Sequence, residues 1–186
     1  MTNLMIINGS IRDGRIGGPI GEWVKRAAEA DGRFTVDYAD LAEIDLPMMN
    51  EPNHPRLKKY LHEHTVAWSN RVEAADGFVF LFPEYNHSFS APIKNAVDYL
   101  HNEWNRKPLG LVNWGGNSGG TRAQAAFKPV AVCVGLVPTK GSIEINFPQR
   151  QLNDNGEFEP NEQQRTVLGL QFDEIVKLSG VLAPLR

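Results

Sequence analysis

The chain of 186 residues has a single cysteine, Cys133, and no long apolar segment. One cysteine excludes an internal disulfide framework and a zinc site built from several thiolates, and it fits a reducing compartment such as the cytoplasm. The longest apolar run, Ala131 to Val137, is far shorter than the roughly 20 residues that span a bilayer. Residues 1–9 lack a basic leader followed by a long apolar stretch, so we expect no secretory signal and no membrane contact.

Neither positive nor negative charge is in large excess in the sequence. The 19 basic and 22 acidic residues give a net charge of −3, so nothing in the totals predicts a nucleic-acid-binding face. None of the five histidines lies four residues from another, which is the helical spacing of a metal-binding pair. We therefore expect no nucleic acid partner and no metal. As a separate expectation, Cys133 fills the core.

What the sequence does contain is an alternation of short apolar runs with longer stretches of helical period, which is typical of a parallel sheet covered by helices. Strands are predicted over 4–8, 34–38, 77–82, 109–113 and 137–145, and helices over 19–30, 57–75, 91–101, 123–134 and 162–178. We predict a single domain over 1–186: an α/β, three-layer, doubly wound parallel sheet of five strands in the order 2-1-3-4-5.

Two segments need a decision between competing signals. Val130 to Val134 is β-branched like a strand, but the apolar residues from Ala123 onward recur with the helical period, so we predict a helix that Gly135 ends. The proline-marked stretch from Leu46 to Pro55 cannot form a regular ladder or a long helix, and a surface loop is predicted there.

In an open sheet of this kind, ligands bind beyond the carboxyl ends of the strands, so the loops at 9–18, 83–90 and 114–120 are the candidate site. The first loop combines glycines, the Ser10 hydroxyl and the guanidinium groups of Arg12 and Arg15 just before a helix N-terminus. Backbone amides and the helix dipole favour a phosphate there. Taken alone, the loop fits an ordinary tight turn between strand and helix equally well.

The second loop is more distinctive, and with the other two it carries a resemblance to a known family. The residues concerned are Gly9, Ser10 and Arg12; the run Pro83-Glu84-Tyr85-Asn86 with the following Lys94-Asn95-Ala96-Val97-Asp98; and the run Gly115-Gly116-Asn117-Ser118-Gly119-Gly120. The chain resembles the NADPH-dependent FMN reductase family of flavodoxin-like proteins over about residues 4–155. The resemblance implies a flavodoxin-like fold.

The resemblance also implies an FMN cofactor whose phosphate lies in the first loop and whose ring lies across the other two. No side chain is expected to act as a catalyst, because FMN carries the chemistry. The cofactor-binding residues it implies are Gly9, Ser10, Arg12, Arg15, Gly17, Gly18, Pro83, Glu84, Tyr85, Asn86, His87, Trp114, Gly115, Gly116, Gly119 and Gly120. Within this set, we expect the Glu84 carboxylate to hold its loop, and His87 stands where glycine is common in the family.

The function implied is electron transfer from NADPH or NADH through FMN to a small acceptor such as free flavin, a quinone, an azo compound or a metal oxyanion. A homodimer or homotetramer is implied too, with the helix at 91–101 and the loop at 48–55 as the candidate contacts. Two alternatives stay open: a flavodoxin-type electron carrier that reacts with protein partners, and a non-catalytic FMN-binding regulator.

Overall fold

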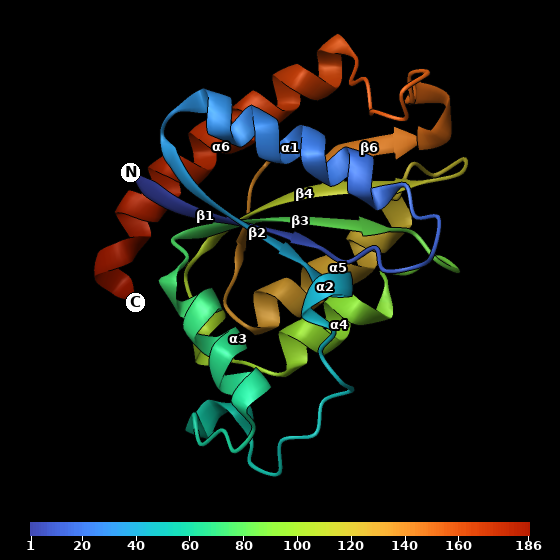
Figure 1. The fold of residues 1–186 in the computed structure, drawn as a ribbon. Helices are drawn as coiled ribbons and strands as arrows, with labels where there is room; N and C mark the ends of the chain where they lie inside the picture. The colour runs from blue at the N-terminus through green and yellow to red at the C-terminus, as the bar shows by residue number, and fades with distance from the viewer.

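The computed structural model describes residues 1–186 and contains a parallel sheet between two layers of helices (Figure 1). The strands are β1 (Thr2–Asn8), β2 (Phe34–Asp40), β3 (Gly77–Pro83), β4 (Pro108–Gly115), β5 (Val137–Pro138) and β6 (Ile143–Asn146). The α-helices are α1 (Gly17–Asp31), α2 (Leu41–Ile44), α3 (Glu63–Ala74), α4 (Ala91–Asp98), α5 (Thr121–Cys133) and α6 (Glu162–Leu182). The strand order β2-β1-β3-β4-β5 confirms the predicted topology. None of the helices combines the length and the apolar character needed to cross a membrane.

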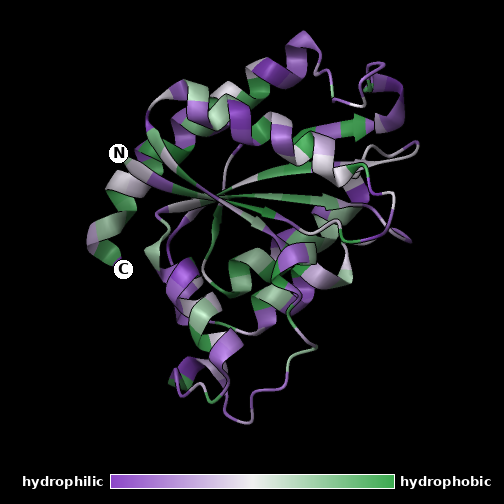
Figure 2. Cartoon of the chain, in the orientation of Figure 1, coloured by the Kyte–Doolittle hydropathy of each residue, from purple (hydrophilic) through white to green (hydrophobic).

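Two apolar clusters hold the layers together, one on each face of the sheet. β3 is buried along its whole length, as its continuous apolar sequence predicts for a central parallel strand. Trp68 and Trp104 pack in the cluster beneath α3, α4 and α5, and Trp23 packs in the cluster beneath α1 and α6. Figure 2 shows the apolar sheet between helices whose outer faces are polar.

The strand predicted over 137–145 is interrupted. The Thr139 amide still donates to the Leu109 carbonyl of β4 at 2.8 Å. The chain then leaves the sheet until β6 begins at Ile143. The Gly141 carbonyl then accepts from the Gln171 side chain on α6 at 3.1 Å. Both pieces, β5 and β6, pair with β4, so a sixth short strand is added without changing the order.

The helix predicted over 57–75 begins only at Glu63. Before it lie a 3-10 turn at Pro55–Leu57 and Lys58 with a φ of 49°. The Glu51 carboxylate, from a distant part of the loop, accepts hydrogen bonds from the amides of Leu61 and His62 at 2.9 and 3.0 Å. Periodicity could not show this start, because the group that binds these amides lies ten residues upstream.

The ambiguous segment before Gly135 is helical, as predicted, and forms α5. Gly135, with a φ of 81°, follows the last turn in the left-handed conformation that only glycine adopts freely. The expectation that Cys133 fills the core is wrong: its side chain is exposed. The apolar side of α5 passes through Phe127 and Ala131 instead, which are fully buried.

One lysine is buried in the fold. Lys107 is 5% exposed, and its Nζ donates to the carbonyls of Val72 and Glu73 at 2.9 and 3.0 Å, at the C-terminus of α3. Burial, with a smaller contribution from the positive charge of Arg186, lowers the pKa of Lys107 to about 8. The fold therefore disfavours the charged form of this side chain relative to the unfolded chain.

This lowered pKa predicts a specific pH dependence of stability. Between pH 8 and the ordinary lysine range, unfolding takes up a proton at Lys107, so its contribution to the free energy of unfolding rises with pH. Urea unfolding at pH 7.5 and 9.5 should show a rise of about 1–2 kcal/mol in the native protein that Lys107→Met removes. Lys128→Met, at an exposed lysine without an ion pair, should leave the rise unchanged. An identical slope in Lys107→Met and the native protein contradicts the assignment.

Candidate functional site

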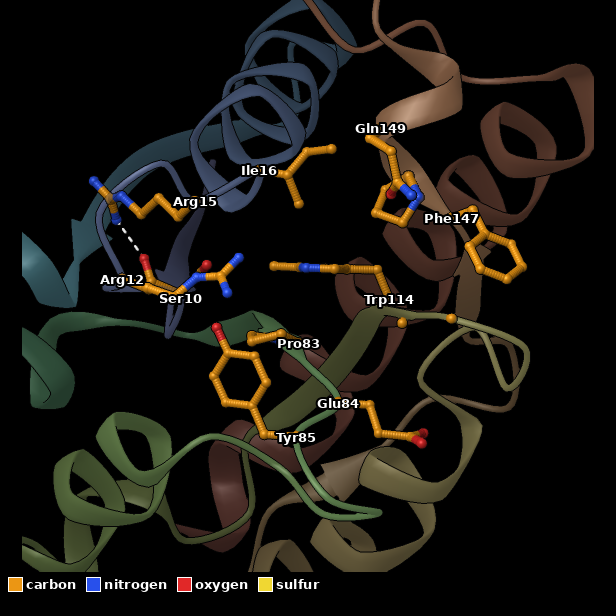
Figure 3. Close-up of a pocket in the computed structure, with 13 residues that line it drawn as sticks. Ser10, Arg12, Arg15, Ile16, Pro83, Glu84, Tyr85, Trp114, Phe147 and Gln149 are labelled. Carbon is orange, nitrogen blue, oxygen red and sulfur yellow. Dashed lines mark hydrogen bonds between the residues drawn. The ribbon is translucent and has the colours of Figure 1, made fainter.

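The three predicted loops meet at the carboxyl edge of the sheet. The Gly9 amide donates to the Leu81 carbonyl at 2.8 Å, and the Glu84 amide donates to the Trp114 carbonyl at 2.8 Å, so the loops leave β1, β3 and β4 side by side. Between them lies an open cleft with a volume of about 200 Å³. It is lined by Ser10, Arg12, Arg15, Ile16, Pro83, Glu84, Tyr85, Trp114, Gly115, Gly116, Phe147, Pro148 and Gln149 (Figure 3).

The first loop is shaped by Asn8, a residue that sequence analysis did not select. Its fully buried side chain accepts from the Ser10 amide at 3.1 Å and donates to the Gly17 carbonyl at 2.9 Å, which joins both ends of the loop. A Cβ atom on Gly17 would lie 2.3 Å from the Ser10 Cβ, so only glycine fits there. The amides of Ile11 and Arg12 donate to no protein group and remain available to a ligand.

The two arginines of this loop differ in their partners. Arg15 donates to both carboxylate oxygens of Asp40 at 2.6 and 2.7 Å and to the Ser10 carbonyl, and the hydrogen bond to Asp40 raises the pKa of Arg15. Arg12 makes no ion pair, and Figure 3 shows its guanidinium pointing into the cleft while that of Arg15 points away. The charge of Arg15 is therefore largely neutralised, and Arg12 is the cation left for a bound anion.

The second loop is a tight two-residue turn. Tyr85 and Ser88 exchange backbone hydrogen bonds of 2.9 Å in both directions, and the residues between them, Asn86 and His87, have φ values of 49° and 67°. Positive φ at both central positions is the type I′ geometry, in which glycine is favoured at the second. The turn uses the amides at its two ends and leaves those of Asn86 and His87 unpaired.

Glu84 and Arg122 fasten this loop to α5. The Glu84 carboxylate accepts from the Arg122 amide and side chain at 3.1 and 2.8 Å. Another guanidinium nitrogen lies 2.6 Å from Nε2 of His87. Burial alone raises the pKa of Glu84, but the Ser118 hydroxyl, the Ala123 amide and Arg122 together bring it below the usual value. Glu84 thus stays ionised and holds the loop, as expected of it, and the contact with Arg122 gives His87 a partner that glycine would lack.

Trp114 and the third loop form the floor and one side of the cleft. Trp114 is 4% exposed and ends β4, and its indole extends into the cleft in Figure 3. The indole N–H groups of Trp68 and Trp104 donate to carbonyls, whereas that of Trp114 has no protein acceptor. The amides of Gly116, Asn117 and Ser118 are also unpaired, and of these three residues Gly116 lines the cleft.

A fourth wall of the cleft was missed by the sequence analysis. It consists of Ile16 at the start of α1 and the segment Phe147–Gln149, which follows β6. The Asn146 side chain donates to the carbonyls of Gly116 and Asn117 at 3.1 and 2.8 Å and so ties this segment to the third loop. Neither a glycine motif nor a charge marks the segment. Only the pairing of β6 beside β4 brings it to the cleft.

The predicted cofactor-binding residues fall into two groups in the structure. Those that line the cleft are Ser10, Arg12, Arg15, Pro83, Glu84, Tyr85, Trp114, Gly115 and Gly116. Those that lie behind or beside it are Gly9, Gly17, Gly18, Asn86, His87, Gly119 and Gly120. Several of the second group shape the backbone: a Cβ atom on Gly9 would lie 2.2 Å from Ile93, and Gly120 has a φ of 96°. Their assignment as FMN ligands stays a prediction.

Comparison with known proteins places the chain in a family. The profile of the NADPH-dependent FMN reductase family matches residues 2–148. An NAD(P)H-dependent FMN reductase of Schizosaccharomyces pombe is 40% identical over 119 residues, which span 63% of this chain and 60% of the relative. Another NAD(P)H-dependent FMN reductase, from a Nectria species, is 34% identical over 149 residues, or 75% of this chain and 74% of the relative.

Solved structures include one with the same arrangement over nearly the whole chain. It is FerB, a flavoenzyme NAD(P)H:(acceptor) oxidoreductase from Paracoccus denitrificans, with a TM-score of 0.77, 23% identity and coverage of 98% of this chain and 99% of that one. At this identity the likeness concerns the flavodoxin-like fold alone. The profile match and the sequence relatives go further: the chain belongs to the NADPH-dependent FMN reductase family.

Proposed function

We propose that this protein is an FMN-dependent oxidoreductase that takes electrons from NADPH or NADH and passes them to a small acceptor. The observation that carries the proposal is the convergence of three loops on a single cleft that is also lined by the unpaired side chain of Arg12 and by two residues with unpaired amides, Arg12 and Gly116. Family membership supports the same assignment. The candidate acceptors are those expected from the resemblance: free flavin, a quinone, an azo compound or a metal oxyanion.

The donor set fits the two ends of FMN. The Arg12 guanidinium, the unpaired Arg12 amide and the Ser10 hydroxyl suit a phosphate dianion, because they combine a cation with neutral donors beside a helix N-terminus. Pro83 and Tyr85 offer an apolar and an aromatic surface for a planar ring, and the unpaired Gly116 amide of the third loop suits its polar edge. When bound, FMN supplies the hydride-accepting and electron-donating chemistry.

The side chains around the cleft contribute position and charge. Glu84 is ionised and engaged by Arg122, so it is not available as a proton donor, and Cys133 is on the surface at the end of α5. Unpaired amides near a reduced flavin would stabilise negative charge without any change in their own protonation. The free thiol of Cys133 is compatible with a reducing compartment, and we propose that the protein is cytoplasmic.

The proposal is tested with purified protein reconstituted with FMN and kept free of oxygen. Addition of NADPH or NADH should bleach the flavin absorbance within the dead time of ordinary mixing, and a quinone or free flavin should restore it over many turnovers. A flavodoxin-type carrier should instead be reduced only through a protein partner. A non-catalytic regulator should bind FMN without steady-state turnover. A protein that binds no flavin refutes all three assignments.

A substitution at Arg12 tests the phosphate end. Arg12→Gln should weaken FMN binding by about 10- to 100-fold, the usual worth of a charge-assisted hydrogen bond, and should leave riboflavin binding within about twofold. Arg165→Gln removes another unpaired arginine, on α6, and serves as the control. Titration of the apoprotein by flavin fluorescence quenching gives both affinities. Equal losses for FMN and riboflavin would show that Arg12 does not bind the phosphate.

We further propose that the protein forms a homodimer or homotetramer through the surface beside the cleft. Met48 is 76% exposed and Ile11 is 49% exposed, and with Pro92 at the start of α4 they line an apolar depression. The loop carrying Met48 is fixed to α4: the Asn95 side chain accepts from the Met49 amide at 2.9 Å and donates to the Pro47 carbonyl at 2.8 Å. A partner on this surface would lie next to the flavin cleft.

The assembly is tested by light scattering after gel filtration. The native protein should elute as a dimer or tetramer, and Met48→Glu should shift it to the monomer, because a carboxylate buried without a partner destabilises an interface. Leu170→Glu introduces the same charge at a residue of α6 that is 59% exposed, and it should leave the assembly intact. A monomeric native protein, or dissociation by Leu170→Glu alone, contradicts the proposed surface.

A further inference from the structure

The segment after β6 carries a second unpaired cation to the edge of the cleft. The Phe147 amide donates to the Gly115 carbonyl at 2.8 Å, and the Arg150 amide donates to the Phe147 carbonyl at 2.9 Å. Phe147 has a φ of 45°, a left-handed conformation that is rare for a bulky side chain and persists only where its surroundings fix it. Arg150 is thus presented by a fixed turn that also lines the cleft.

The charge of Arg150 is not neutralised within the protein. Its guanidinium lies 4.4 Å from the centre of the Phe147 ring and makes no hydrogen bond or ion pair. Among the arginine side chains, only those of Arg12, Arg150 and Arg165 make neither. Arg165 lies on α6, in a groove against α1. Arg12 lines the candidate site, and Arg150 directly follows the segment that forms its fourth wall. A guanidinium stacked on an aromatic ring keeps its N–H edge free for a phosphate.

Arg12 and Arg150 occupy different positions relative to the cleft. Arg12 lies in the first loop and points into the cleft (Figure 3), where it would bind the phosphate of FMN in the proposed function. Arg150 follows Gln149, the last residue of this segment that lines the cleft, and is itself exposed outside the lining. The proposed reaction brings a second anionic reactant, a nicotinamide dinucleotide. With its nicotinamide ring inside the cleft, its adenosine end must lie outside, and in NADPH that end carries a 2′-phosphate.

We propose that Arg150, supported by Phe147, binds the 2′-phosphate of NADPH and makes the protein prefer NADPH to NADH. This inference rests on the proposed function. It assigns the preference to one side chain, because a guanidinium at the outer edge gains a charge-assisted contact with the 2′-phosphate and meets only a hydroxyl in NADH.

The test measures binding to the FMN-loaded protein by calorimetry, with NADP⁺, NAD⁺ and adenosine 2′-phosphate as probes. Arg150→Gln should weaken binding of NADP⁺ and adenosine 2′-phosphate about tenfold or more and leave NAD⁺ within about twofold. Arg150→Lys should recover part of the loss, since it keeps the charge without the planar fork. Arg165→Gln should change none of the three affinities. The FMN affinity should be unchanged in Arg150→Gln and reduced in Arg12→Gln.

Three results would overturn the inference. They are an equal loss of NAD⁺ and NADP⁺ binding in Arg150→Gln, an unchanged NADP⁺ affinity, and a loss of FMN affinity in that variant. Reduction of the flavin by NADPH in the native protein separates these failures from failure of the proposed function. If the native protein is reduced and Arg150→Gln behaves like it, only the role of Arg150 is refuted.

Discussion

The parallel register of β1, β3 and β4 is the constraint on which the cleft depends. Because the three strands run in the same direction, their carboxyl ends lie at one edge, and the hydrogen bonds from Gly9 to Leu81 and from Glu84 to Trp114 fix how far each loop extends. Backbone groups beyond the last ladder bond have no partner strand. The first and third loops therefore bring unpaired amides, those of Arg12 and Gly116, to residues that line the same cleft, and a bound ligand can satisfy them without any rearrangement of the sheet.

Charge at the site follows a division between paired and unpaired arginines. Arg15 and Arg122 are each held by a carboxylate, those of Asp40 and Glu84, and they fix the shapes of the first and second loops. Arg12 and Arg150 have no such partner. A protein with a net charge of −3 thus has one uncompensated cation in the cleft and a second directly after the segment that forms its fourth wall, and we assign these two to the phosphates of the cofactor and of the electron donor.

Local patterns were sufficient to predict the first four strands and the three loops, and the fold type that they indicate gave the strand order, whereas the last predicted strand is divided into β5 and β6. The apolar run of β3 and the helical period of α5 are properties of adjacent residues, so sequence shows them directly. Contacts between distant residues were not visible: the Glu51 carboxylate that precedes α3, the Asn8 side chain under the first loop, and the fourth wall at Phe147 all depend on tertiary packing. The partner of Arg15, and the lack of one for Arg12, were hidden for the same reason.

The predicted cofactor-binding glycines show why a sequence pattern and a binding site are not the same. Gly9, Gly17 and Gly120 are required by neighbouring atoms, since a Cβ on any of them would lie within 2.6 Å of another side chain or the backbone. These positions would be kept by any protein that folds its loops this way, with or without a ligand. The features that the fold does not require are the unpaired guanidinium of Arg12, the unpaired indole N–H of Trp114 and the unpaired amides beside them. Unused donors gathered in one cleft stabilise nothing until a ligand accepts from them, so they, more than the glycines, indicate that the cleft is built to bind.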